Sequence, residues 1–195
     1  MSMDSPTAFR PKGLLFGLIL PGAGHMATGQ AARGVLVLAG VLGLFFGGIF
    51  IGGIDVVDSQ EDQIWFIGEA LVGPIAFGVD AVHQRHFKAY DPEMLKKVVT
   101  AQELERVPRR SGYPDEMRVE QTLQLSGGPV TVPVFVPAAA GKGPPNQKSL
   151  AKVNELGTLF CTIAGMMNLI AVIDAAFPSD RRKTPGQAVA PEVPA

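Results

Sequence analysis

Apolar residues gather in four blocks along the chain, and longer polar stretches separate them. The cleanest block covers residues 34–54 (GVLVLAGVLGLFFGGIFIGGI) and contains no charged side chain. A helix of this length measures about 30 Å, the thickness of the hydrocarbon core of a bilayer. A helix that is apolar on all sides over such a length is typical of membrane spans. The pattern therefore predicts a membrane-spanning helix over 34–54.

Two further blocks are also long enough to cross a bilayer. Residues 64–82 form the first, in which Glu69 and Asp80 interrupt the apolar run and Pro74 should kink the helix. The second ends the apolar part of the chain and carries no charge from residue 156 until Asp174. We predict membrane-spanning helices over 64–82 and 153–178.

The first block, residues 13–28, is short for a span. Read as one helix it measures about 24 Å, and Pro21 and Gly22 interrupt it. It either crosses a thinned bilayer or enters the bilayer and turns back at the Pro-Gly pair. A cleaved signal peptide is a third interpretation, which the span that follows within a few residues disfavours. Depending on this block, the chain has three or four transmembrane helices.

The region between the last two spans, residues 83–152, has a pattern of its own. Apolar residues at helical spacing predict an amphipathic helix over 92–107. Two alternating apolar runs around a Gly-Gly-Pro turn predict a β-hairpin over 118–137. Two segments are predicted to lack fixed structure: the linker 138–148 and the tail 179–195.

Charges assign these parts to the two sides of a membrane. The loop 55–63 holds four acidic residues and no basic one, whereas Lys and Arg follow the 64–82 block closely. The positive-inside rule then places the insertion 83–152 in the cytoplasm and the acidic loop outside. The expected fold is an all-α multi-pass protein of the inner (cytoplasmic) membrane. Its N-terminal membrane region covers residues 1–82, and its small cytoplasmic α+β insertion holds a helix and a hairpin.

Composition narrows the chemistry and the partners. Only 18% of the residues are charged and the net charge is −1, so we expect no binding of nucleic acid. The single cysteine, Cys161, excludes a disulfide framework within the chain and a multi-cysteine metal site. The sequence shows no nucleophile-and-base motif, phosphate-binding glycine loop or zinc-protease helix. We therefore expect a protein that is not an enzyme and holds no cofactor.

Small residues recur at helical spacing in two of the predicted spans. They are Ala39, Gly43 and Gly47 on one face, Gly48 and Gly52 on another, and Gly157, Cys161 and Gly165 in the last span. Such stripes let helix backbones approach closely in lipid. We expect them to pack the helices of this chain together. Contact with a second copy, or with other membrane proteins, is the alternative.

Three polar residues near the end of the 64–82 block are candidate metal ligands. Asp80, His83 and His86 are spaced three apart and would share one face of a helix. Carboxylate and histidine ligands of this kind bind divalent metals in helical bundles. A polar cluster at the membrane edge is the simpler interpretation, and we prefer it.

Four more polar residues lie within apolar blocks, where such residues are functional candidates by default. Glu69 and Asn168 are two of them, and Glu69 is expected to reach the outer headgroups. Asp174 is expected to pair with Arg181 or Arg182. His25 follows the Pro-Gly break, and interrupted membrane segments are where transporters place their sites. Transporters usually contain a second interrupted segment, and we identify none in this sequence.

The run LPGAGHMATGQAARG resembles the signature of two-transmembrane-segment domain proteins, in which a helix ends in a Pro/Gly break and a glycine-flanked polar loop follows. The matching positions are Pro21, Gly22, Gly24, His25, Gly29 and Gly34. Together with the last span, this motif is similar to an uncharacterised family of small bacterial multi-pass membrane proteins. The resemblance implies an inner-membrane protein without an assigned reaction.

Two functional classes are favoured by these observations, and a third is weighed against them. The first is a non-enzymatic membrane protein with a structural or protein-interaction role, whose partners are the lipid bilayer and a second copy or other membrane proteins. The second is a small transporter, channel or metal-handling protein that uses His25, Glu69, Asp80 or Asp174. We favour the first because the small-residue faces are prominent and no reaction site is visible. A membrane-embedded enzyme is the third and least favoured class.

Overall fold

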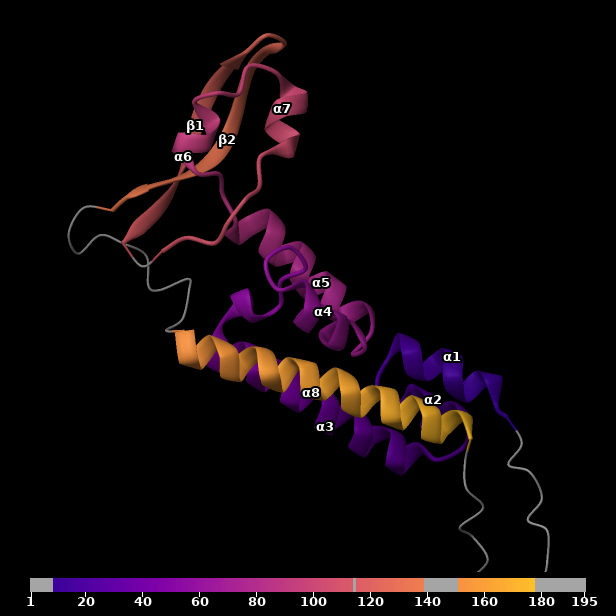
Figure 1. The fold of residues 1–195 in the computed structure, drawn as a ribbon. Helices are drawn as coiled ribbons and strands as arrows, with labels where there is room; N and C mark the ends of the chain where they lie inside the picture. The colour runs from indigo at the N-terminus through magenta and orange to yellow at the C-terminus, as the bar shows by residue number, and fades with distance from the viewer. Residues whose placement is uncertain (1–8, 114, 139–150, 178–195) are drawn as a thin grey trace, which may run out of the picture.

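The computed structural model describes residues 9–113, 115–138 and 151–177. In this part the chain is mostly helical, with one small antiparallel sheet (Figure 1). The predicted tail 179–195 and nearly all of the predicted linker lie outside the described residues. The helices are α1 (Pro11–Ile19), α2 (Ala23–Ala27), α3 (Ala31–Gly52), α4 (Gln63–Ala70), α5 (Pro74–Val82), α6 (Pro92–Leu95), α7 (Ala101–Arg106) and α8 (Ala151–Ala176). The strands are β1 (Glu116–Leu125) and β2 (Gly128–Pro137), and a π turn, His83–Phe87, extends α5.

Helices α3 and α8 lie side by side and antiparallel along the length of the molecule (Figure 1). At one end, an Arg33 nitrogen lies 2.8 Å from an Asp174 oxygen. At the other end, a Cβ on Gly52 would lie 3.1 Å from the Cα of Gly157. The close approach depends on small residues, because a Cβ on Gly48 would lie 2.7 Å from a Gly157 backbone oxygen.

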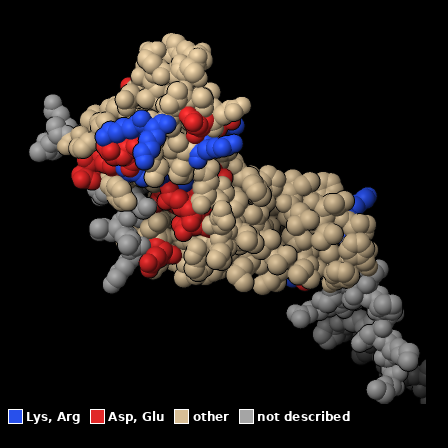
Figure 2. All heavy atoms as spheres, turned by 45° about the horizontal axis from the view of Figure 1, so that its top comes forward, with Lys and Arg blue, Asp and Glu red and all other residues tan. Residues whose placement is uncertain are grey.

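Two helices are long and apolar enough to cross a membrane: α3 and residues Val153–Ala176 of α8. Only 22% of the apolar window in α3 and 44% of that in α8 is buried inside the structure. The core helix of a soluble protein would be mostly buried. Figure 2 shows the same feature from outside, since most of the charged side chains on this face gather at one end and a wide uncharged surface covers most of the rest.

The predicted span over 64–82 is wrong, because this segment forms two short helices that run in opposite directions. Helix α4 passes from the loop around Ser59 to the middle of α8, and α5 returns until Asp80 accepts hydrogen bonds from the Ser59 backbone N–H (3.0 Å) and hydroxyl (2.7 Å). The reversal occurs at Gly73, whose φ of +108° suits glycine, and at Pro74, which has no N–H to continue a helix. With 8 and 9 residues, each helix covers about 12–14 Å, less than half of a bilayer core.

The first apolar block also folds back on itself instead of forming one helix over 13–28. Helix α1 starts beside the end of α8, where Arg10 N–H donates to the Ala176 carbonyl (2.9 Å). The chain reverses at Gly22, whose φ is +78°. Helix α2 then returns until Gly24 lies against the backbone of Gly13. This geometry corresponds to the second interpretation of the block, a segment that turns back at the Pro-Gly pair.

The predicted β-hairpin is confirmed, with β1 and β2 antiparallel and Leu125 opposite Gly128 across a two-residue turn. The helix expected over 92–107 is instead two short helices, α6 and α7. Thr100 accepts a hydrogen bond from the Glu103 N–H (3.2 Å), and Glu103 accepts one from the Thr100 N–H (3.0 Å). This capping box starts a new helix and so separates α7 from α6. Both helices pack on the hairpin in a small apolar core formed by Tyr90, Leu95, Leu104, Leu125, Val132 and Val134.

The acidic loop 55–63 and the insertion lie at the same end of the α3–α8 pair, not on opposite sides. Lys88, which follows the π turn, has its Nζ 2.6 Å from an Asp58 oxygen. Ser111 of the insertion donates its hydroxyl hydrogen to Asp55. The physical reason is the reversal at Gly73, which brings the chain back to the end from which α4 started.

Candidate functional site

The two folded-back segments, α1–α2 and α4–α5, meet at the middle of α8. There Asn168 donates from Nδ2 to the Leu71 carbonyl (2.8 Å) and, more weakly, to the Gly17 carbonyl (3.4 Å). In a continuous helix the Gly17 carbonyl would accept from residue 21, but Pro21 has no N–H. The Leu71 carbonyl likewise lies where α4 ends. Asn168, which is 1% exposed, thus supplies both interrupted segments with a donor that their own backbones lack.

The tips of the two segments also touch each other. A Cβ on Gly73 would lie 2.8 Å from the Leu18 carbonyl oxygen and 3.2 Å from that of Ile19. Gly73 therefore allows the end of α4 to contact the end of α1. The sequence analysis identified only the break at Pro21–Gly22. The Gly73–Pro74 break creates a second interrupted segment. The sequence analysis did not identify it, because residues 64–82 were predicted to form one kinked span.

Glu69 lies on α4 close to this meeting point and is completely buried. Neither carboxylate oxygen has a hydrogen-bond partner among the described residues. The expectation that Glu69 reaches the headgroups is wrong, because Gly68 packs α4 so tightly on α8 that a Cβ there would lie 2.5 Å from Thr162 Cγ2. Two further buried oxygens on α8, Thr162 Oγ1 and Asn168 Oδ1, also have no partner in the described part of the chain.

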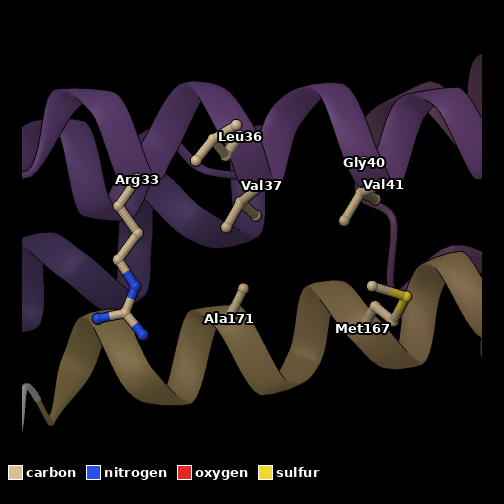
Figure 3. Close-up of a pocket in the computed structure, with 7 residues that line it drawn as sticks. All are labelled: Arg33, Leu36, Val37, Gly40, Val41, Met167 and Ala171. Atoms are coloured by element: carbon tan, nitrogen blue, oxygen red, sulfur yellow. The ribbon is translucent and has the colours of Figure 1, made fainter.

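A second polar cluster lies at the end of the molecule that carries α2 and the start of α3. His25 Nε2 is 2.8 Å from Asp174 Oδ2, and Arg33 Nη2 lies at the same distance from that oxygen. Asp174 was expected to pair with Arg181 or Arg182, which lie outside the described residues; in the structure it pairs with His25 and Arg33. A groove of about 260 Å³ between α3 and α8 begins beside Arg33 (Figure 3).

The motif glycines build this end of the structure. Gly22 and Gly34 lie back to back, since a Cβ on Gly34 would be 2.6 Å from the Gly22 carbonyl oxygen. Gly29, with a φ of +85°, reverses the chain into α3. These three glycines, together with Pro21 and Gly24, allow α2 to fold against α1 and α3. This fold brings His25 to Asp174.

A third polar cluster joins the helices to the insertion. The predicted metal ligands Asp80, His83 and His86 are not brought together there, because His86 is exposed and Asp80 bonds to Ser59. His83 instead lies with Asp55 and Asp58, and one ligand atom from each of the three lies within 4.8 Å of the others.

Two carboxylates and a histidine form a reasonable ligand set for a divalent metal, but donors of this chain already occupy the oxygens. Lys88 Nζ lies against Asp58, and the Ser111 hydroxyl donates to Asp55. Burial raises the pKa of Asp58, but the hydrogen bonds from Lys88 and from the backbone N–H groups of Gln60 and Glu61 outweigh it and lower that pKa below its ordinary value. The cluster is therefore accounted for as a polar junction within the chain, held by the Lys88–Asp58 ion pair and the Ser111–Asp55 hydrogen bond.

The same junction contains a serine, a histidine and aspartates, but it lacks the geometry of a hydrolase. Ser111 is 5% exposed, and its hydroxyl hydrogen goes to Asp55 and not to His83, which is 3.3 Å away. The sequence analysis missed Asp55, Lys88 and Ser111 as partners. They are far apart in the chain, and no local spacing signals their contact.

The structure thus defines a class of helical protein with two long apolar helices, two folded-back helical segments and a small α+β insertion. The chain belongs to a family of unknown function, DUF6677, whose model matches residues 13–185. This confirms the prediction of an uncharacterised family. No curated protein and no solved structure matches the chain.

Proposed function

We propose that this protein is a multi-pass protein of the inner membrane in which α3 and α8 cross the bilayer. The segments α1–α2 and α4–α5 then enter from opposite faces and meet near the midplane. Most of the apolar surface of α3 and α8 is uncovered by the chain, which supports contact with lipid. Irregular backbone is tolerated at membrane depth only where protein or a polar cavity satisfies it. Asn168 fulfils that requirement at both interrupted segments.

We further propose that the protein acts as a small transporter or channel for an ion. The observation that carries this proposal is the meeting of two interrupted helices from opposite ends at Asn168. Transporters place their binding sites at such meeting points, because interrupted helices expose backbone carbonyls and helix ends in the bilayer interior. This favours the second of the two functional classes considered from sequence, because the break at Gly73 supplies the second interrupted segment that the sequence analysis did not identify.

The two ends of the molecule fit the same interpretation. His25, Arg33 and Asp174 lie at one end, and Asp58 and Asp80 lie at the other. Each interrupted segment starts near one of these clusters, and the reversal between its two helices lies at Asn168. Ionisable groups would thus be present at both entrances to the proposed site.

A structural role remains the second candidate, and one observation favours it. Beyond the local helix backbone, no atom of the described residues lies within 4 Å of where a Cβ on Gly43 or Gly47 of α3 would lie, and Ala39 beside them is exposed. This face of α3 is free to contact a second copy or another membrane protein. The two candidates are compatible, because a site in so small a chain can require neighbouring copies to complete a path.

Thiol labelling tests the proposed topology. We would introduce single cysteines by Ala32→Cys, Gln60→Cys and Ser126→Cys and label intact cells with a membrane-impermeant reagent. Gln60→Cys and Ser126→Cys should behave alike, and Ala32→Cys should behave oppositely. The parent chain is the unlabelled control, since its one thiol, Cys161, is buried. Opposite labelling of positions 60 and 126 would refute the proposed arrangement.

Ion flux tests the proposed transport. The full chain would be reconstituted into liposomes, and proton, sodium and potassium movement would be recorded with ion-sensitive dyes under an imposed gradient. We expect flux of one ion above that of empty liposomes and at least a tenfold reduction in Asn168→Ala. Asn154→Ala, the same change near the other end of α8, is the matched control. Absence of flux for all three ions would refute the transport proposal.

A further inference from the structure

The site at the meeting of the two segments contains a carboxyl group that nothing in the described chain neutralises. Glu69 is fully buried, and both of its carboxylate oxygens are without a partner among the described residues. An ionised carboxylate without a partner is strongly disfavoured in such surroundings. A buried ionisable residue of this kind in a membrane segment is a candidate functional group. The carboxyl therefore carries a proton or binds another cation.

No basic side chain of the described part is placed to neutralise Glu69. The buried Lys88 pairs with Asp58 and Glu61, and Arg33 pairs with Asp174. The charged groups that act on Glu69 are Asp62, Asp58 and Asp80, from the loop before α4 and from α5, and all are acidic. From α8, the facing titratable group is the thiol of Cys161. The described surroundings of Glu69 thus supply no fixed cation.

The position of Glu69 connects this carboxyl to the interrupted helices. It lies on the last turn of α4, two residues before the Leu71 carbonyl that Asn168 binds. The unpartnered oxygens of Thr162 and Asn168 lie on the α8 face that packs against α4. From Asp80 towards the middle of α8 there are thus an acidic group at the entrance, the buried Glu69 carboxyl, and oxygen acceptors on α8 that have no partner among the described residues.

We propose that Glu69 is the proton-binding group of this protein and that the transported ion is the proton. The inference rests on the proposed transport function and specifies its ion. A proton that enters past the acidic loop forms an O–H bond with a Glu69 oxygen, and the same bond breaks when the proton leaves towards the opposite end. No other bond changes and no redox partner is required.

A carbodiimide tests the protonation of Glu69 without any need for transport. Dicyclohexylcarbodiimide reacts with a protonated carboxyl in an apolar site and adds to it as a whole molecule, which mass spectrometry of peptides detects. Purified full-length protein in detergent at neutral pH should be modified at Glu69 and protected at high pH. Glu69→Gln should abolish the labelling, and Glu105→Gln, an exposed carboxyl on α7, should leave it unchanged.

Proton flux in liposomes tests the role of the same group. Glu69→Gln should reduce proton flux at least tenfold, Glu69→Asp should retain part of it, and Glu105→Gln should not change it. Because the glutamine side chain matches the neutral carboxyl in shape, Glu69→Gln should also keep the thermal midpoint of the parent, which separates loss of function from loss of fold.

The outcomes separate this inference from the transport proposal. Labelling of Glu69 without flux of any ion would refute transport and leave Glu69 as a buried proton-binding carboxyl. Flux that persists in Glu69→Gln, or flux of sodium or potassium instead of protons, would refute the inference and retain transport. Absence of labelling at neutral pH would also overturn the inference, because the carboxyl would then be ionised or inaccessible.

Discussion

The junction between the helices and the insertion depends on one buried ion pair, which can be broken by a single substitution. Lys88 is fully buried, and its Nζ lies 2.6 Å from Asp58 Oδ2 and 3.1 Å from Glu61 Oε1. Lys88→Met keeps the length and apolar part of the side chain and removes the charge. The change leaves Asp58, which is 1% exposed, without its cation.

The size of the effect follows from the remaining donors. The N–H groups of Gln60 and Glu61 and the amide of Gln84 all donate to Asp58 Oδ1, and none of them reaches Oδ2. Glu61 is about one-third exposed and can turn to water. Removal of one partner of a buried ion pair costs about 3–5 kcal/mol, and we expect about 3 kcal/mol here because one oxygen of Asp58 stays well bonded. For a chain of this size that corresponds to a fall of roughly 6–12 °C in the apparent thermal midpoint.

Thermal unfolding of the purified chain in detergent, followed by circular dichroism, measures this fall. Lys88→Met combined with Asp58→Asn should recover most of the loss, because the second change removes the unpaired charge. Lys96→Met is the matched control, since its partner Glu93 is exposed and surface pairs contribute little. The reasoning would be refuted if Lys88→Met left the midpoint unchanged, or if the double variant were less stable than Lys88→Met alone.

Three further predictions concern stability and packing. Gly47→Ala should raise the thermal midpoint slightly, because no described atom beyond the local helix backbone lies within 4 Å of the added Cβ and alanine favours helix. Gly48→Ala should instead lower the free energy of unfolding by about 1–3 kcal/mol, because its Cβ would lie 2.7 Å from Cys161 Sγ. Equal midpoints in the two variants would contradict the packing of α3 on α8. Gly73→Ala should abolish flux and destabilise the chain, because the φ of Gly73 is +108° and the new Cβ would lie 2.8 Å from the Leu18 carbonyl oxygen. Normal flux in this variant would show that the two segments need not touch. Since the pKa of Asp58 is lowered in the folded chain, its stabilising contribution is complete above its ordinary value of 3.8 and is lost as the pH falls below that value. The midpoint should therefore fall as the pH drops below about 4, and it should fall more steeply in the parent than in Asp58→Asn.

The elements with a strong local pattern could be predicted from the sequence. The apolar run that forms most of α3 contains no proline and no charged residue, and a continuous helix satisfies its backbone polar groups without help from other segments. The hairpin β1–β2 is equally local, since strand alternation and a glycine turn define both its strands and its register. The Pro21–Gly22 break was visible for the same reason.

The direction of the chain after a break was not visible. Gly73 and Pro74 are compatible both with a kink, which would continue the span, and with the reversal that the structure shows. The choice depends on whether distant groups satisfy the freed carbonyls, and Asn168 does so from a helix 97 residues away in the chain. The reversal in turn returns the chain, and with it the insertion, to the end that carries the acidic loop.

The sequence by itself thus determined that the chain contains long apolar helices, a break after α1, a β-hairpin and isolated polar residues in apolar surroundings. Only the tertiary structure decided that Glu69 is buried without a partner, that Asp174 pairs with His25 and Arg33, and that Lys88 neutralises Asp58. The difference has one physical cause. Helices and hairpins form from neighbouring residues, whereas the energy of a buried charge depends on which distant side chains fold against it.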